Sequence, residues 1–246
     1  HAAATKIVPT AEYNPFECVR TNVLGAMNVI DACIDQRVKK VVALSTDKAS
    51  SPINLYGASK LCSDKLFCSQ INNTNKTIFS VVRYGNVLGS RGSVIPFFLS
   101  LKDKTYLPIT HKDMTRFFLT LKDAVEFVSF AFEKMVGGEI YVKKLSSIKI
   151  LKLAKIISPR SKIKIIGIRE GEKIHEQMIG KDDSAFTVEF KKHYEILPNL
   201  RIKEDKIKVG GKKVNNNFYY GSDNTSLIDE KYLKKEIENI KVRQTF

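Results

Sequence analysis

The 246-residue sequence contains no apolar run approaching the ~20 residues of a membrane-spanning helix, and it opens with no signal peptide. Its cysteines are few and lack the spacing of metal ligands: Cys18, Cys33, Cys62 and Cys68. We interpret them as reduced thiols of a cytoplasmic protein, and we expect neither a metal site nor membrane contact. The first residue is His1 rather than Met, so we expect that the natural N-terminus is absent.

The sequence is far from electrically neutral. It has 41 Lys and Arg residues against 26 Asp and Glu, a formal net charge of +15. Such charge raises nucleic-acid binding as a possible function. The lysines, however, are spread from Lys39 to Lys241 and rarely alternate with aromatic residues, and no RNA- or DNA-binding signature accompanies them. We therefore expect a lysine-rich solvated surface and no nucleic-acid partner, while a non-catalytic basic binding module stays open as an alternative.

The first part of the chain predicts a long helix. Asn14 and Pro15 form a helix start, because an N-cap residue is followed by proline at the first helical position. Apolar residues then recur at helical spacing: Phe16, Val19, Val23, Met27, Ile30 and Ile34. We expect residues 15–36 to form an amphipathic helix with these residues on its buried face.

Two nearly uninterrupted apolar runs, residues 38–46 and 77–87, are typical of buried parallel strands. Between them Pro52 marks the entry to a helix that we expect to run to about Asn72. Strand, helix and strand in this order predict a βαβ unit. In such sheets ligands bind beyond the carboxyl ends of the strands, so the residues that end both strands are expected to face one crevice.

After Gly92 the pattern changes. We expect short helices in "VIPFFLSLKD" and "LTLKDAVEFVSFAFEKM", strands in "GEIYVKK" and "KIKIIGI" around a helix near 147–157, and a final helix over 229–240. The tail from about Lys203 is rich in lysine and asparagine. These segments predict a smaller mixed domain.

The stretch "STDKASSPINLYGASK" concentrates proton-handling side chains. Tyr56 and Lys60 are four residues apart on a predicted helix and therefore share one face. A nearby ammonium favours phenolate, so we expect Lys60 to lower the pKa of Tyr56 toward the range of a general base. The hydroxyl of Ser45 or Thr46 can hold a substrate alcohol. Together these groups suit removal of a proton from an alcohol whose carbon gives hydride to a nicotinamide, although a surface tyrosine beside a surface lysine is the plainer alternative.

Asp47 and Lys48 supply an acid and a base in the same stretch. Once a sugar carbon is oxidised to a ketone, the neighbouring C–H becomes acidic. A lysine can take that proton while a carboxylic acid protonates a departing hydroxyl, so the pair suits elimination of water. The alternative is an ordinary solvated ion pair in a loop.

Several stretches together resemble one family: "HAAATKIVPTAEYNP", "STDKASSPINLYGASK", "SVVRYGNVLGSRGSVIPFF", "MTRFF" and "IGIREGEKIHEQMI". From His1 to about Tyr220 the chain is similar to the extended short-chain dehydrogenases. Within them it resembles the inverting UDP-N-acetylglucosamine 4,6-dehydratases, which begin pseudaminic acid biosynthesis. The resemblance implies an α/β fold, with the C-terminal part of a Rossmann-type doubly wound parallel sheet in residues 1–92. It places a smaller mixed α/β substrate domain mainly in residues 93–246, with some segments returning to the sheet.

The resemblance also implies roles. Tyr56 and Lys60 would form the hydride-transfer pair and contact the cofactor ribose. Lys48 would be the base at C5, Asp47 the acid at the C6 hydroxyl, and Thr46 a hydrogen-bonding group near C4. The cofactor would be NADP, lined by Ala2, Lys6, Val87, Leu88, Gly89, Ser90 and Arg91 in addition to Tyr56 and Lys60. The UDP-sugar would be held by Leu44, Ser45, Asn86, Val94, Thr110 and Arg169, of which the arginine suits phosphate oxygens.

One motif of the family is absent from the sequence. A dinucleotide site needs Gly-x-Gly-x-x-Gly after a strand, whereas Gly85, Gly89 and Gly92 are spaced differently and precede no suitable helix. We therefore expect the N-terminal βα units to be missing, the flank of the central strand to be exposed, and this chain alone to be inactive and to bind NADP poorly. The full-length protein is expected to form a homo-oligomer. A UDP-hexose 4-epimerase remains the alternative enzyme.

Overall fold

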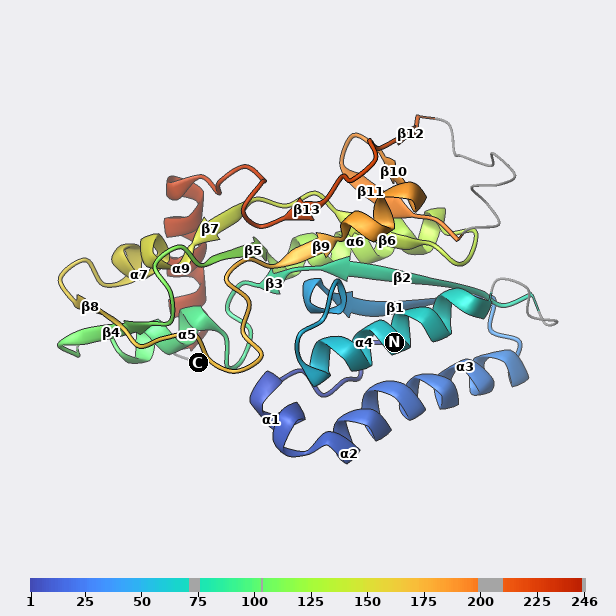
Figure 1. Cartoon of the computed structure of the whole chain (residues 1–246), viewed down its shortest axis with the longest axis horizontal. Helices are drawn as coiled ribbons and strands as arrows, with labels where there is room; N and C mark the ends of the chain where they lie inside the picture. Colours follow the sequence, from blue (N-terminus) through green and yellow to red (C-terminus); the bar gives the residue numbers. More distant parts are fainter. Residues whose placement is uncertain (71–75, 103, 199–209, 245–246) are drawn as a thin grey trace. The chain divides into compact units, whose positions relative to one another are not determined.

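The computed structural model describes residues 1–70, 76–102, 104–198 and 210–244, which form two compact units, each with its own hydrophobic core (Figure 1). The first unit comprises His1–Tyr84, Val125–Lys144 and Gln177–Tyr220, and the second comprises Gly85–Ala124, Leu145–Glu176 and Gly221–Phe246. Within the described ranges no helix has both the length and the apolar character needed to cross a membrane.

The first unit is built on a six-stranded sheet with the order β1-β2-β6-β11-β10-β12. The strands are β1 (Lys40–Thr46), β2 (Ile78–Tyr84), β6 (Ile140–Lys143), β11 (His193–Ile196), β10 (Thr187–Glu189) and β12 (Lys212–Lys213). The first three are parallel and the others antiparallel, which confirms the α/β fold with a parallel sheet. Strand β6, which the sequence grouped with the smaller domain, pairs with β2, and the sequence did not reveal β10–β12.

Helices cover both faces of this sheet (Figure 1). Helix α4 (Leu55–Ser69) lies on one face, where the rings of Phe67 and Phe79 are 6.0 Å apart. Helix α6 (Leu121–Lys134) covers the other face with Phe127, which packs in a cluster with Val42 and Val82. Successive residues of a strand point to opposite faces, so β2 presents Phe79 to α4 and Val82 to α6. The predicted end of α4 near Asn72, and the lysine-rich tail from about Lys203 to residue 209, lie outside the described residues.

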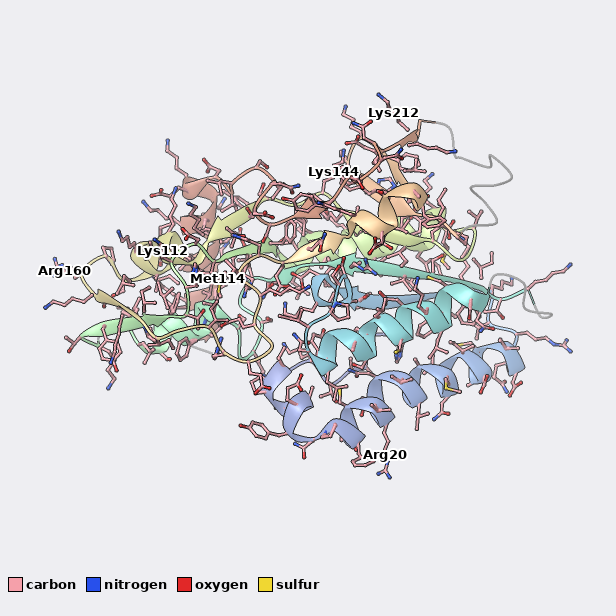
Figure 2. All side chains as sticks on the ribbon, in the orientation of Figure 1. Arg20, Lys112, Met114, Lys144, Arg160 and Lys212 are labelled. Atoms are coloured by element: carbon pink, nitrogen blue, oxygen red, sulfur yellow. The ribbon has the colours of Figure 1, made fainter. Side chains whose placement is uncertain are left out.

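The predicted long helix is present, but its buried face was predicted wrongly. It runs through α2 (Pro15–Val19), a π-helical turn η1 (Arg20–Leu24) and α3 (Gly25–Asp35), preceded by α1 (Val8–Tyr13). Phe16 is 82% exposed, and Val19 and Met27 are exposed too. The buried residues are four apart, Cys18, Asn22, Ala26 and Ile30, and of these Ile30 alone was predicted. Because most of these side chains are short, this helix can pack closely against α4, and Arg20 points away from α4 (Figure 2).

The second unit combines a three-stranded and a two-stranded sheet. Strands β3 (Asn86–Val87), β5 (Thr115–Leu119) and β7 (Ser147–Lys149) form one, and β4 (Tyr106–Ile109) pairs in parallel with β8 (Lys162–Ile165). Helices α5 (Val94–Ser100), α7 (Ile150–Ile157) and α9 (Glu230–Gln244) pack around one apolar core. These helices were predicted, whereas β4, β5 and β7 were not.

Candidate active site

The site begins where β1 ends. Thr46 is the N-cap of a short 3-10 turn, η2 (Asp47–Ala49), and its hydroxyl oxygen accepts a hydrogen bond from the Lys48 amide at 3.3 Å. The same hydroxyl donates to Asp47 Oδ1 at 2.9 Å. Thr46 pairs with Tyr84 across the parallel ladder, so the carboxyl ends of β1 and β2 meet at one edge of the sheet, as the sequence predicted.

Asp47 and Lys48 form a close ion pair. Lys48 Nζ lies 3.0 Å from Asp47 Oδ1, and the carboxylate side chain is 1% exposed against 20% for the lysine. The pair is therefore not the solvated surface contact that the sequence left open. A carboxylate held in a buried turn keeps its lysine partner at a fixed position.

Helix α4 brings Tyr56 and Lys60 to this turn. The helix is capped by Asn54, whose side-chain oxygen accepts from the Gly57 amide at 2.7 Å. Gly57 permits a very close approach, because a Cβ at this position would stand 2.3 Å from the carbonyl oxygen of Lys48. The absence of a side chain at residue 57 thus places the start of α4 directly against η2, and both Tyr56 and Lys60 are buried.

The electrostatics of Tyr56 differ from the expectation. Burial raises the pKa of Tyr56 to about 12, while the charge of Lys48 and a hydrogen bond with Thr46 pull it down, and Asp47 and Asp64 raise it further. The largest opposing charge is that of Lys48, and the prediction that the pKa of Tyr56 is lowered toward the range of a general base was wrong. The physical reason is that burial outweighs the nearby positive charge.

Lys60 has an unusual environment for a cation. It is 4% exposed, and it makes no hydrogen bond or ion pair with any residue in the described ranges. Burial lowers its pKa, and the charge of Asp64 opposes that shift. A buried ammonium without a hydrogen-bond partner has donors available for the hydroxyl groups of a ligand.

A residue that sequence reasoning missed, Asn22, holds the "HAAATK" segment in place. Its side-chain oxygen accepts from the Thr5 amide at 2.8 Å, and its amide nitrogen donates to the Thr5 carbonyl at 3.0 Å and to Ser59 Oγ at 2.9 Å. Asn22 lies in the π-helical turn, a feature frequent at functional sites. The available signal was a polar residue within an apolar-periodic helix. Ala2 and Lys6 lie within this segment and are exposed.

The remaining predicted cofactor residues belong to the second unit. Val87 lies on β3, and Leu88 turns its side chain into the core of this unit. Gly89 has a φ of +72°, and a Cβ there would meet the Ile240 side chain at 2.8 Å. Ser90 is half-buried and Arg91 is exposed. The roles of these residues at a cofactor stay predictions.

The predicted substrate residues are divided between the units. Ser45 and Leu44 end β1 in the first unit, whereas the others belong to the second: Asn86, Val94, Thr110 and Arg169. Thr110 is buried and donates to Met114 Sδ at 3.4 Å. Arg169 is exposed and binds Glu172 Oε1 at 2.9 Å. No hydrogen bond joins Thr110 to Arg169 within the described ranges.

Glu172 is shared by two arginines. Besides Arg169, Arg116 Nη2 lies 3.8 Å from the same oxygen. Burial acts to raise the pKa of Glu172, but the hydrogen bond and charge of Arg169 outweigh burial, and the pKa is lowered. Glu172 is therefore an anion that restrains the exposed Arg169 side chain.

Residues 1–198 match the model of a family described as polysaccharide biosynthesis protein. A Campylobacter jejuni protein named UDP-N-acetylglucosamine 4,6-dehydratase (inverting) is 53% identical over 235 residues, which cover 91% of this chain and 70% of that protein. A Rickettsia canadensis protein named UDP-glucose 4-epimerase is 45% identical over 203 residues, covering 80% of this chain and 60% of that protein. The chain is thus similar to proteins named for both of the activities that its sequence raised.

The solved structure of Pen from Bacillus thuringiensis has a similar fold, with a TM-score of 0.85, 35% identity, and coverage of 98% of this chain and 74% of that one. DesIV from Streptomyces venezuelae, a dTDP-glucose 4,6-dehydratase solved with NAD and TYD, has a TM-score of 0.64 at 22% identity. The alignment covers 70% of this chain and 61% of DesIV. At 22% identity the similarity shows the fold alone. These likenesses confirm the predicted Rossmann-type α/β fold.

Proposed function

Because the chain belongs to the polysaccharide biosynthesis protein family, we propose that it is a nucleotide-sugar 4,6-dehydratase, a hydro-lyase acting on UDP-N-acetylglucosamine with inversion at C5. The reaction oxidises C4, removes water across C5 and C6, and returns hydride to C6. The observation that supports this proposal most is the Asp47–Lys48 pair against Tyr56 at the end of β1. That arrangement supplies an acid, a base and an alcohol-deprotonating group within one turn and one helix end.

Each proton of the reaction has a candidate group. Tyr56 acts as a phenolate that takes the proton of the C4 hydroxyl, a form that the Lys48 charge and the Thr46 hydrogen bond favour against burial, and Thr46 positions that hydroxyl. Lys48 takes the C5 proton once C4 is a ketone, because the adjacent carbonyl makes that C–H acidic. Asp47 gives a proton to the C6 hydroxyl, which leaves as water. The C5–C6 double bond that results accepts hydride at C6 and a proton at C5.

The Asp47–Lys48 contact explains how both groups reach the protonation states they need. As an ion pair, the lysine is an ammonium and the aspartate a carboxylate, which is the reverse of what elimination requires. Transfer of one proton along the 3.0 Å contact gives a neutral amine and a carboxylic acid.

We propose NADP as the cofactor. The unpartnered, buried ammonium of Lys60 fits ribose hydroxyl groups, and Tyr56, Ala2 and Lys6 would lie along the same side. When bound, NADP would supply the hydride acceptor for C4 and the hydride donor for C6. The glycine fingerprint for the cofactor phosphates is not in this sequence, so the residues present fit the nicotinamide half alone.

For the substrate we propose two sets of contacts. The backbone of Leu44 and Ser45 near the end of β1 would contact the sugar, with Asn86 and Val94 as further contacts. Arg169 would bind the diphosphate, because its guanidinium is exposed and held by Glu172, and Thr110 would lie beside it. Assembly into a homo-oligomer, a cytoplasmic location and a role in pseudaminic acid biosynthesis stay predictions.

The test is product analysis. The full-length protein, with the N-terminal βα units that this sequence lacks, is incubated with UDP-N-acetylglucosamine and either NADP or NAD in deuterated water, and products are followed by mass spectrometry and NMR. We expect a 4-keto-6-deoxy product that has lost one water and carries deuterium at C5, with NADP preferred. A product that keeps its water and differs at C4 alone would contradict the proposal.

The epimerase is the second candidate, favoured by the similarity to the Rickettsia protein. Both enzymes need Tyr56 and Lys60, but an epimerase needs no acid and base for elimination. Replacement Lys48→Ala separates them. A dehydratase loses release of water and C5 deuterium exchange yet still oxidises C4, whereas an epimerase keeps its product.

A further inference from the structure

Asp64 extends the functional face of α4. Tyr56, Lys60 and Asp64 follow each other at four-residue spacing, and all three are buried, Asp64 at 1% exposure. None of the motifs discussed above includes Asp64. A carboxylate one turn beyond a buried, unpartnered lysine therefore needs a physical explanation.

The Asp64 carboxylate binds the end of the catalytic strand. Its Oδ2 atom accepts a hydrogen bond from Ser45 Oγ at 2.8 Å and lies 3.1 Å from Arg83 Nη2. Ser45 and Arg83 are paired residues on β1 and β2, so the carboxylate joins both strands at one level of the ladder. Ser45 directly precedes Thr46, Asp47 and the rest of the proposed proton-transfer turn.

Arg83 anchors this carboxylate from the other side. The guanidinium is 2% exposed, its Nη1 donates to the Met178 carbonyl at 2.8 Å, and the same atom lies 3.9 Å from Asp183 Oδ2. Met178 belongs to β9 (Gln177–Ile179), which contacts η2. The planar fork of arginine thus holds α4, β2 and β9 together around Asp64.

We propose that Asp64 is a positioning residue of the dehydration site: anchored by Arg83, its carboxylate fixes Ser45 beneath the Asp47–Lys48 turn and supplies the negative charge opposite the buried Lys60. This inference rests on the proposed function. The Asp64 carboxylate therefore has two roles. The hydrogen bond sets where β1 ends, and the charge keeps Lys60 an ammonium that can donate to ligand hydroxyls.

The charge of Asp64, on the same helix, acts on Lys60: it raises the pKa of Lys60 against the lowering by burial. Removal of the Asp64 charge leaves no anion acting on Lys60 among the described residues, so the lysine should lose its proton at lower pH.

The chain offers a matched control. Glu139 is a second buried carboxylate of the same unit, and it accepts from Ser80 Oγ at 2.7 Å and from the amide of Gly137 at 2.7 Å. It does not act on Lys60. Variants Asp64→Asn and Glu139→Gln therefore both remove a buried negative charge beside a serine, but one alone affects Lys60.

The experiment uses variants of the full-length protein and measures acetylation of Lys60 by acetic anhydride against pH, read by peptide mass spectrometry, together with dehydration kinetics. For Asp64→Asn we expect the labelling midpoint of Lys60 to fall by about one pH unit or more, and kcat to fall about tenfold or more. Glu139→Gln should leave the midpoint unchanged. Ser45→Ala, which keeps the charge, should lower kcat with no change in the midpoint.

The outcomes are distinguishable. An unchanged Lys60 midpoint in Asp64→Asn, or equal shifts in Asp64→Asn and Glu139→Gln, overturns the inference. If Asp64→Asn does not fold, Ser45→Ala decides, because unchanged kcat in that variant overturns the positioning role. Failure of the full-length protein to dehydrate any UDP-sugar, with the midpoint shift intact, refutes the proposed function and leaves the electrostatic role of Asp64 standing.

Discussion

Gly57 on α4 lies against the backbone carbonyl of Lys48, at a distance where a Cβ atom would stand 2.3 Å from the oxygen. This contact places the helix that carries Tyr56 and Lys60 against the turn that carries Asp47 and Lys48. Backbone atoms cannot move aside as a flexible side chain can. The spacing between the Tyr56 phenol and the Asp47–Lys48 pair therefore depends on the absence of a side chain at Gly57.

Replacement Gly57→Ala should disrupt this contact. We expect a loss of about 1–3 kcal/mol in the free energy of unfolding, because the new methyl group forces α4 away from η2. Urea unfolding measures this loss in the free energy of unfolding. Gly25→Ala is the control, since its Cβ would meet the Arg20 carbonyl at an ordinary 3.5 Å, and alanine should stabilise the helix by about 0.5–1 kcal/mol. Equal effects of both replacements would contradict the packing argument.

Asn22→Ala should release the "HAAATK" segment. The variant leaves the Thr5 amide and carbonyl without their partner, at a cost of about 1–3 kcal/mol. Hydrogen exchange at the Thr5 amide should become much faster. Asn28→Ala, an exposed site on α3, should change neither exchange nor stability. Unchanged protection of Thr5 in Asn22→Ala would show that other contacts hold the segment.

The raised pKa of Tyr56 predicts an alkaline loss of stability. An unfolded tyrosine titrates at 10.0, but the folded phenol keeps its proton to about 12. Below pH 10 the contribution is fully present, and it is lost as pH rises from 10 to 12, by about 2–3 kcal/mol at most. The lowered pKa of Lys60 makes the free energy of unfolding rise with pH, so Lys60 opposes the loss caused by Tyr56. Urea unfolding at pH 9 and 11.5 should therefore show a smaller loss for Tyr56→Phe than for the unmodified chain, and equal losses would refute the shift.

Arg169→Ala tests the diphosphate contact. Loss of a charge-assisted bond should raise KM for the UDP-sugar about tenfold to a hundredfold with little change in kcat or in unfolding free energy, because Arg169 is exposed. Arg160→Ala, at the exposed position labelled in Figure 2, is the matched control and should leave KM unchanged. An equal effect of both variants would indicate a general charge effect.

The local parts of this protein follow from its sequence. Apolar runs predict β1 and β2, Pro52 precedes α4, and the four-residue spacing of Tyr56 and Lys60 puts both on one buried face. The Asp47–Lys48 pair lies in sequence next to the strand end that presents it. These features depend on neighbours a few residues away, and backbone geometry relates such neighbours directly.

Helix 15–35 shows where this reasoning fails. Its apolar spacing predicted Phe16 and Met27 in the core, but a π-helical turn intervenes, and the neighbouring α4 accepts the face of Cys18 and Asn22. Periodicity identifies a helix, whereas its buried face depends on which partner lies within packing distance. The short, mainly antiparallel strands of the sheet edge escaped prediction for the same reason, since their partners are distant in sequence.

The sequence by itself determined the α/β class, the strand–helix–strand unit and the set of groups able to move protons. Tertiary structure alone decided that burial raises the pKa of Tyr56 with Lys48 as the largest opposing charge, that Asn22 holds Thr5, and that Asp64 joins Ser45 to Arg83. The physical reason is that pKa values and hydrogen-bond partners depend on burial and on distances between atoms, which long-range packing sets.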